Sequence, residues 1–591
     1  MKKIFLIFLV VSAAVYYSCS KSFLDRPSVG SLDSTVLANQ RGVEQTLIGA
    51  YALLDGYAQS GPDGNTIGDF ISGTSNWVYG DAAADNTHKG SDGTDQPNIT
   101  FFEKHTQIPS NPFLNSKWVT IYEGVTRCNF VLKLMAQATD ISDDDKKRIE
   151  GEARILRAFY HLEGKKIYNN IPFIDETMTS YSVPNVNILQ DNTVDAWPRI
   201  QADAQYAYDN LPGTQIAVGR INKWGAGALL GKILLFQKKW TEAKAVLLNV
   251  YNSGTNSSGV KYALYSGYQN NFDIAFENGS ESVFAFQSSS NDHSGAGNGN
   301  YGEVLNMPYN ARPFTCCGFN QPSQDLVNAF KTDPVTGLPD PDNFDTNPVT
   351  IDDGSVSFVP YAGTLDPRVD WTVGRRGIPF LDWAVMEGTV WQRDAGFGGP
   401  YSPKKNIYRK AQEETYSDHD FWNAPSAISS LNINLIRFAD VILWLAECEV
   451  EAGDLEQARA YVNMIRARAA DPVSYVYKYN DDAHPENGFS ATPAANYKVG
   501  LYTAAWTDQA AARKAVHFER RLELSMEGHR FFDLVRWGEA ESTINKYLSY
   551  EKTLRSYLSD AVFTTNQDEY MPIPQRQIDL SKGTLTQNPG Y

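Results

Sequence analysis

Two adjacent cysteines, Cys316 and Cys317, lie between Phe314 and Phe319. Adjacent Cα atoms are about 3.8 Å apart, closer than the ~4.4 Å at the short end of ordinary disulfides. A bond between them would therefore strain the connecting peptide, and strained backbone collects at functional sites. The bonded pair would present a flat, uncharged sulfur surface that suits the apolar face of a ring-shaped ligand such as a sugar. We predict a vicinal disulfide that lines a ligand site; the alternative is two reduced, buried thiols in a turn.

Two glycine-rich segments, 55–95 and 391–401, mix aromatic and polar side chains. Sugars have an apolar C–H face and a rim of hydroxyls, so their binding sites combine flat aromatic rings with Asp, Asn and Arg side chains. The residues predicted to contact such a ligand are Asp63, Asn65, Trp77, Asp85, Asn86, Cys316, Cys317, Trp391, Arg393 and Tyr401. For any single aromatic residue, the alternative is that it packs its loop onto the helices beneath.

A catalytic interpretation rests on Glu523 and Glu527. Residues four apart on a helix have Cβ atoms about 5–6 Å apart, near the carboxylate spacing of retaining glycosidases. A glycosidase needs carboxylates that face each other across a cleft, however, and a single helix stripe does not supply this. The chain also lacks H-E-x-x-H and G-x-S-x-G motifs. We therefore predict a binding protein that is not an enzyme and uses no cofactor or metal, with a glycoside hydrolase as the remote alternative.

Two further motifs match ligand sites only in part. Residues 227–232 resemble a phosphate-binding loop, but they are one residue short and Ile233 replaces the Ser or Thr that would meet the metal. We interpret them as a helix-packing motif. Asp340, Asp342 and Asp345 miss the spacing of a calcium-binding loop, so they are predicted to form a solvated turn.

The overall charge narrows the class of partner. The 591 residues carry a formal net charge of −17 and contain no run of Lys or Arg. This argues against nucleic acid and against anionic lipid surfaces as partners. The chain has 12 Trp, 32 Tyr and 29 Phe, more aromatic residues than a helical core usually needs. Some of them are expected to face a ligand.

The N-terminal residues are typical of an exported lipoprotein. Lys2 and Lys3 precede an apolar stretch, residues 4–15, which is too short to span a membrane. Cys19 follows it after a small residue, as lipoprotein processing requires. We predict a signal peptide over 1–18, lipidation at Cys19 and a tether over 19–35, with the lipid as the only contact with the membrane. Simple secretion with a chance cysteine is the alternative.

Helical periodicity dominates the remainder of the chain. Apolar residues recur at helical spacing over 36–54, 118–134 and 149–168. Two helix–turn–helix units, within 224–250 and 436–468, have the same layout, and shifting the first onto the second places Trp240 on Leu455 and Ala243 on Ala458. Such hairpins pack like tetratricopeptide repeats. Cys128 and Cys448 fall in helical segments and are predicted to be small core residues.

Residues 251–430 differ from these helical segments. Gly, Pro, Asn and Asp dominate there, and short apolar runs such as 282–286 are typical of strands. We predict a mainly α fold with a tetratricopeptide-like helical scaffold and a loop-rich second layer that contains short strands. Residues 36–591 form a single domain in this prediction, with the scaffold at about 36–250 and 431–591 and the ligand-binding layer at about 251–430.

Several motifs together resemble one protein family. Residues 437–447 (RFADVILWLAE) and 519–538 (ERRLELSMEGHRFFDLVRWG) are similar to two signature helices of the SusD/RagB family of nutrient-binding outer-membrane lipoproteins. The endings MPIP at 571–574 and QNPGY at 587–591 fit the same family, as do FLD at 23–25 and EARILRAF at 152–159. These motifs occur in order along the whole mature chain.

The resemblance implies more than a fold. Members of this family bind nutrients outside the cell and cover a TonB-dependent barrel of the SusC type, which takes up the substrate. The resemblance therefore implies that the protein has a SusC-like transporter as its partner. It also implies an outer-membrane location, lipid-anchored and facing the cell exterior. The aromatic and acidic loops favour a glycan ligand. Peptide capture by the same architecture is the alternative, and it would favour strand edges and apolar pockets instead.

Overall fold

The structure is a computed structural model that describes residues 34–56, 59–60, 66–67, 69–177, 191–293, 298–310, 314, 316–418 and 428–591. The predicted signal peptide 1–18, the predicted lipidation site Cys19 and most of the tether 19–35 lie outside this part of the chain. Asp63 and Asn65 also lie outside the described residues. In the part that is described, no helix is both long and apolar enough to cross a membrane.

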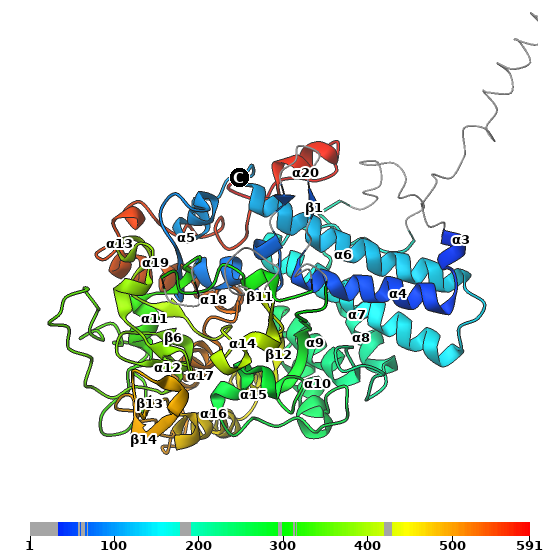
Figure 1. The fold of residues 1–591 in the computed structure, drawn as a ribbon. Coiled ribbons are helices and arrows are strands. Elements are labelled where there is room, and N and C mark those ends of the chain that lie inside the picture. The colour runs from blue at the N-terminus through cyan, green and yellow to red at the C-terminus, as the bar shows by residue number, and fades with distance from the viewer. Residues whose placement is uncertain are drawn as a thin grey trace, which may run out of the picture.

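The first long helices pack in a row, each against the next (Figure 1). The row runs through α4 (Gln40–Tyr51), α6 (Pro112–Gln137), α7 (Asp143–Tyr168) and α8 (Trp197–Asn210). Polar side chains fix where two of them begin: Asn111 accepts a hydrogen bond from the N–H of Phe113, and Ser142 accepts one from the N–H of Asp145. Three aspartates in the first turn of α7 and two lysines in its last turn also suit the helix dipole.

The two predicted hairpins are present and continue the row. They are α9 (Lys223–Phe236) with α10 (Trp240–Ser253), and α15 (Phe438–Ala452) with α16 (Leu455–Ala470). Ala243 and Ala458 are both fully buried, as the matched layout predicts. A Cβ atom on Gly231 would lie 2.5 Å from a methyl carbon of Leu247, so residues 227–232 are indeed a close-packing motif. Because α10 packs against α15, the two halves of the scaffold meet although about 180 residues separate them.

The C-terminal helices complete the scaffold. They are α17 (Gln509–Leu524), α18 (Arg530–Trp537), α19 (Ala540–Glu551) and α20 (Gln575–Leu580), and α17 packs against both α15 and α16. The chain then returns to the first helices: the N–H of Met571 donates to the carbonyl of Ile167, and the side chain of Asn588 donates to that of Tyr168. Cys128 and Cys448 are buried free thiols in this core, as predicted.

A second layer of short elements lies on one side of this scaffold (Figure 1). Its strands pair antiparallel, two at a time. The pairs are β1 (Gln59–Ser60) with β2 (Thr66–Ile67), β3 (Thr87–Gly90) with β5 (Phe319–Pro322), β4 (Ser282–Phe286) with β12 (Ile433–Arg437), β6 (Val373–Gly374) with β9 (Ser402–Pro403), β7 (Pro379–Phe380) with β8 (Ala384–Val385), β10 (Ser417–Asp418) with β11 (Ile428–Ser429), and β13 (Tyr477–Tyr479) with β14 (Phe489–Pro493). The short helices α5 (Thr100–Lys104), α11 (Gln324–Ala329), α12 (Arg368–Thr372), α13 (Ala395–Gly398) and α14 (Glu413–Tyr416) accompany them, whereas the short α3 (Ser34–Leu37) packs on α4 at the edge of the scaffold (Figure 1). The mainly α fold with a loop-rich layer of short strands is therefore confirmed.

The segment 69–95 is more buried than a surface loop would be. It forms the π-helix η3 (Trp77–Ala82) and then β3, and both are buried. The π-helix packs directly on the start of α18, and a Cβ atom on Gly80 would lie 2.1 Å from the carbonyl oxygen of Gly528. Glycine at both positions lets the two backbones approach this closely. Much of the segment predicted to be a ligand-binding loop is therefore part of the core.

A buried network of ion pairs joins α17 to the second layer. It contains Glu519 and Glu523 of α17 and Glu527 just beyond it. Glu519 lies 2.8 Å from both Arg368 and Arg466, and Glu527 lies 2.6 Å from Lys405. The basic residues near this stripe in the sequence point elsewhere: Arg520 contacts Asp533 and Arg530 contacts Asp85.

The same network bears on the catalytic alternative. Glu523 is fully buried and contacts Arg368, Arg437 and Arg468, while Glu527 contacts Arg437 and Lys405. Burial alone would raise the pKa of Glu523, but the three guanidinium groups hold it well below its usual range. Both carboxylates are thus held by internal cations and do not face each other across a cleft. This arrangement stabilises the fold and gives no support to a glycosidase site.

Candidate functional site

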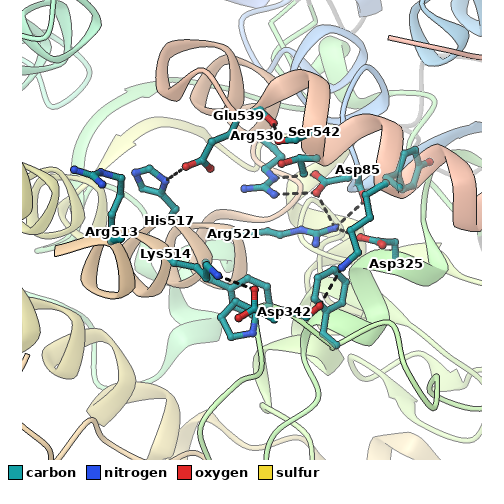
Figure 2. Close-up of a pocket in the computed structure, with 17 residues that line it drawn as sticks. Asp85, Asp325, Asp342, Arg513, Lys514, His517, Arg521, Arg530, Glu539 and Ser542 are labelled. Atoms are coloured by element: carbon teal, nitrogen blue, oxygen red, sulfur yellow. Dashed lines mark hydrogen bonds and ion pairs between the residues drawn. The ribbon is translucent and has the colours of Figure 1, made fainter. Parts of the chain in front are cut away.

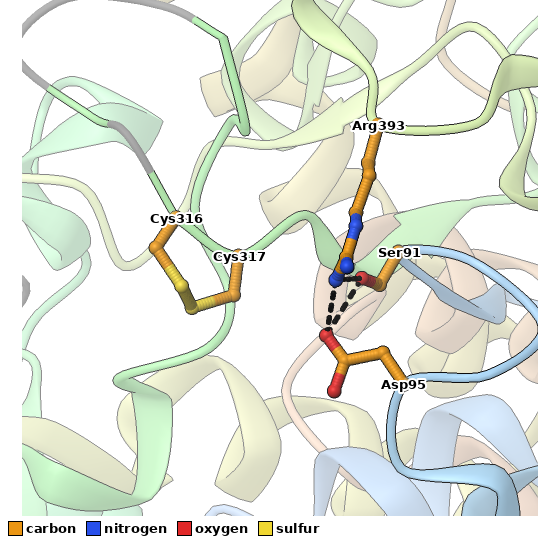
Figure 3. The surroundings of a disulfide bond; sticks show 5 residues. All are labelled: Ser91, Asp95, Cys316, Cys317 and Arg393. Atoms are coloured by element: carbon orange, nitrogen blue, oxygen red, sulfur yellow. Dashed lines mark hydrogen bonds and ion pairs between the residues drawn. A yellow bond between two sulfur atoms is a disulfide. The ribbon is translucent and has the colours of Figure 1, made fainter.

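Cys316 and Cys317 are joined by a disulfide bond just before β5 (Figure 3). Cys317 is 3% exposed, whereas Cys316 is only partly buried and presents part of the bonded pair to the surface. The two phenylalanines that flank the disulfide pack against aromatic side chains of other segments. Phe314 packs edge-on against Trp383 at 5.0 Å, and Phe319 packs edge-on against Trp77 at 6.1 Å.

The β3–β5 ribbon aligns the disulfide with the segment that follows β3. Gly90 pairs with Phe319, and the N–H of Ser91 donates to the carbonyl oxygen of Gly318 at 2.5 Å. Gly318 has a φ of +74°, and its N–H donates to the carbonyl of Met307. Since a side chain is strained at this φ, glycine fits the turn that leads from the disulfide into the strand.

Arg393 lies across the turn formed by residues 91–95 (Figure 3). Its guanidinium group is 2.8 Å from a carboxylate oxygen of Asp92 and 2.6 Å from one of Asp95, and it donates to the hydroxyl of Ser91 at 3.1 Å. The same group lies 5.3 Å from the ring centre of Tyr309. One third of the Arg393 side chain is exposed, so it remains accessible to a ligand.

A second aromatic surface lies next to this arginine. Phe397 of α13 stacks on Tyr557 with ring centres 4.1 Å apart, and both rings are partly exposed. The ammonium group of Lys89 lies 4.8 Å from the Phe397 ring and donates to the carbonyls of Asp92 and Asp95. Burial lowers the pKa of Lys89 to about 8. Its main contribution is to hold the 91–95 turn against α13.

Three predicted ligand-binding aromatics are buried instead. Trp77 is 2% exposed and donates to the carbonyls of Phe70 and Gly302. Trp391 is 5% exposed and packs on Phe380, and the hydroxyl of the buried Tyr401 donates to Gln324 at 2.6 Å. These side chains attach their loops to the core, which is the alternative that the sequence left open for each aromatic residue. We therefore leave them out of the candidate site.

Asp85 and Asn86 are buried as well, at the opposite end of β3 from the disulfide. Burial alone would raise the pKa of Asp85, but Arg521 and Arg530 lower it to about 2. Asn86 donates to the carboxylate of Asp81 at 3.1 Å. Both side chains therefore make internal polar contacts and are separated from the disulfide surface by the length of the strand.

The predicted residues that the structure brings to one surface are Cys316, Cys317 and Arg393. We call this surface, together with Asp92, Asp95, Tyr309 and Phe397, the disulfide surface. Asp92 and Asp95 were missed in the sequence, although the D-G-T-D pattern at 92–95 is typical of a turn in which the first Asp accepts hydrogen bonds from N–H groups two and three residues on. The surface offers an apolar sulfur face, two partly exposed rings and a paired arginine and aspartates for hydroxyl groups.

Known proteins are similar to this chain along nearly all its length. The family model described as "SusD family" matches residues 280–591, and the model described as "Starch-binding associating with outer membrane" matches residues 22–235. A SusD-like protein of Bacteroides ovatus is 23% identical over 606 aligned positions, which cover 99% of this chain and 91% of that protein.

Solved structures have the same fold. A laminarin-binding SusD-like protein matches with a TM-score of 0.63 at 23% identity, over 94% of this chain and 100% of its own. Surface glycan-binding protein A from Bacteroides thetaiotaomicron, solved in complex with laminarihexaose, matches with a TM-score of 0.60 at 18% identity, over 93% of this chain and 99% of its own. The likeness establishes the arrangement of helices and second layer described above.

Proposed function

The chain belongs to the SusD/RagB family, and from this we propose that it captures a glycan outside the cell and delivers it to a SusC-like TonB-dependent transporter. Family membership carries the proposal. Two structural relatives named for laminarin or laminarihexaose support a glycan as the ligand.

The disulfide surface is the place where we propose that the glycan binds. Its sulfur face and the rings of Tyr309 and Phe397 suit the C–H face of a sugar, and Arg393 with Asp92 and Asp95 can hydrogen-bond pairs of hydroxyls. These contacts do not use a strand edge or an apolar pocket, which are the features that would favour a peptide ligand.

Binding should depend on Arg393 and on the cysteine pair. We expect Arg393→Ala and the double variant Cys316→Ala/Cys317→Ala each to weaken glycan binding about tenfold, the effect of losing one good polar or stacking contact. Calorimetric titration against laminarin, other polysaccharides and a panel of peptides would measure this. Intact mass before and after reduction would show the bond directly, as a gain of two hydrogens.

The matched control for Arg393 is Arg459→Ala, because Arg459 forms a partly exposed ion pair with Glu456 on α16, away from the disulfide surface. It should bind like the wild type. Binding of peptides but of no polysaccharide would overturn the glycan assignment. If the Arg393→Ala and cysteine variants are well folded and bind the glycan with wild-type affinity, the disulfide surface is not the glycan-binding site.

We also propose that Cys19 carries the lipid and that the mature chain lies on the outer face of the outer membrane. The motif that precedes Cys19 and the family model named for outer-membrane association support this. Metabolic labelling with a fatty-acid analogue should mark the wild type and leave Cys19→Ala unmarked. A TonB-dependent barrel should co-purify with the labelled protein after detergent extraction. Equal labelling of both proteins would rule out lipidation at Cys19.

A further inference from the structure

A cleft of about 510 Å³ opens between α17, α19 and the loop 341–344 (Figure 2). It is the size of a site for a small ligand. The lining residues include Asp85, Asp325, Asp342, Arg513, Lys514, Arg521, Arg530, Glu539, Lys546 and Tyr547. None of the residues of the disulfide surface lines it.

The cleft does not share the strong negative charge of the chain. Five basic side chains, those of Arg513, Lys514, Arg521, Arg530 and Lys546, line it with four carboxylates, and two further carboxylates, Glu451 and Asp345, contact Arg513 and Lys546. Because these charges nearly balance, whereas the whole chain has a formal net charge of −17, an anionic group is repelled less in this cleft than over most of the molecule.

The inner end of the cleft is formed by buried arginine–aspartate pairs. Arg530 is 2.8 Å from Asp85, and Arg521 is 2.6 Å from Asp325 and 3.2 Å from Asp85 (Figure 2). Beside this quartet, the hydroxyl of Tyr547 has no hydrogen-bond partner in the described structure, although the side chain is 2% exposed. A buried hydroxyl is costly to leave unpaired, so a ligand that accepts a hydrogen bond there would be favoured.

The mouth of the cleft contains two lysines whose ion-pair partners a ligand could replace. Lys514 is 2.7 Å from Asp342, with the two side chains 54% and 64% exposed, and Lys546 is 3.3 Å from Asp345 with 48% of its side chain exposed. Exposed pairs of this kind are worth only about 0–1 kcal/mol. An incoming carboxylate or sulfate can therefore replace Asp342 as the partner of Lys514, and Asp345 as the partner of Lys546, at little cost.

The remaining lining fits a sugar body. The ring of Phe344 forms one wall and has Lys546 and Arg521 at 5.2 and 5.3 Å from its centre. Ser542 and Thr543, in the first turn of α19, add hydroxyl groups to the lining. We propose that this cleft is a second ligand site, which binds a sugar unit that carries a carboxylate or a sulfate ester.

The second site is separate from the disulfide surface. Asp85 lines the cleft before β3 begins, and Ser91 lies at the disulfide surface after β3 ends. The four residues of β3, at about 3.3 Å each, span about 13 Å between the two. The second site can therefore bind acidic units of a glycan independently of the disulfide surface, so the inference goes beyond the function proposed above.

Calorimetric titration with digalacturonate, glucose 6-sulfate, cellobiose and sodium sulfate tests the inference. We expect the wild type to bind at least one of the two acidic sugars, about tenfold more tightly than cellobiose and than sodium sulfate, and less tightly as salt is added. In Lys514→Ala/Lys546→Ala the affinity should fall about tenfold, because two charged contacts are lost from exposed positions that do not support the fold.

The matched control is Lys478→Ala/Lys582→Ala, which removes the same charge from exposed lysines that do not line the cleft. Its affinity for the acidic sugar should equal that of the wild type, as should that of Arg393→Ala. The inference is overturned if neither acidic sugar binds, if the control loses as much affinity as the cleft variant, or if Arg393→Ala abolishes the binding. Tighter binding of acetyl-triglutamate than of both sugars would instead identify a site for an acidic peptide. Since the acidic probes and the lysine variants are not those that test the disulfide surface, the two proposals fail separately.

Discussion

Replacing Glu523 with glutamine is expected to lower the free energy of unfolding by about 3–5 kcal/mol, the usual cost of breaking a buried ion pair on one side. The carboxylate is fully buried and contacts the guanidinium groups of Arg368, Arg437 and Arg468. Glutamine keeps the shape but removes the charge that these three cations share. Urea unfolding, followed by circular dichroism, would measure the change.

The matched control is Glu123→Gln on α6. Its ion pair with Arg127 is about one third exposed on each side, so its loss should cost less than about 1 kcal/mol. A Glu523→Gln protein as stable as the Glu123→Gln protein would show that the buried network is not what holds α17 to the second layer.

The helices could be predicted because their buried faces repeat every three to four residues. Their ends could not be predicted from that period. The segment predicted at 118–134 is α6 (Pro112–Gln137), and its first turn is set by Asn111 and Pro112, neither of which continues the apolar stripe. In the same way α7 begins at Asp143, six residues before the first apolar residue of the predicted segment.

The candidate site could be predicted only where neighbours in sequence are also neighbours in space. The disulfide between Cys316 and Cys317 could be predicted because the two cysteines are adjacent in the sequence. Glycine, aspartate and tryptophan make a segment look like an exposed loop, and Asp85 was assigned to a ligand on that basis. Its actual partner, Arg530, is 445 residues away along the chain, and no local pattern indicates such a contact. Burial of Trp77 likewise depends on Gly302 and Phe319, which are distant in sequence.

The middle of the β3–β5 ribbon gives a prediction for the dependence of stability on pH. His88 is completely buried between two carboxylates: Nδ1 lies 2.7 Å from Glu103, and Nε2 lies 3.3 Å from Glu551. The hydroxyl of Tyr557, which stacks on Phe397 of the disulfide surface, donates to the same Glu103. Burial alone would lower the pKa of His88, but the two glutamates outweigh it and raise the pKa from 6.5 to about 9.

The sign of the effect follows from this shift. Since the folded protein holds the proton more tightly than the unfolded chain, the imidazolium stabilises the fold fully below about pH 6.5. The stabilisation is lost as the pH rises through about 9. Below about pH 6.5 it is worth roughly 3 kcal/mol, and between the two values it falls by about 1.4 kcal/mol per pH unit.

Replacing His88 with glutamine isolates this contribution from that of other groups that titrate in the same range. We expect the variant to be less stable than the wild type by roughly 3 kcal/mol near pH 6, and the difference to shrink toward zero near pH 10. Urea unfolding of both proteins at several pH values would measure it. His484→Gln is the control, because His484 lies in an exposed pair with Glu486 and should leave the profile unchanged. A constant difference between His88→Gln and wild type from pH 6 to 10 would mean that His88 acts through packing alone, and that its charge does not hold the ribbon between the two sites.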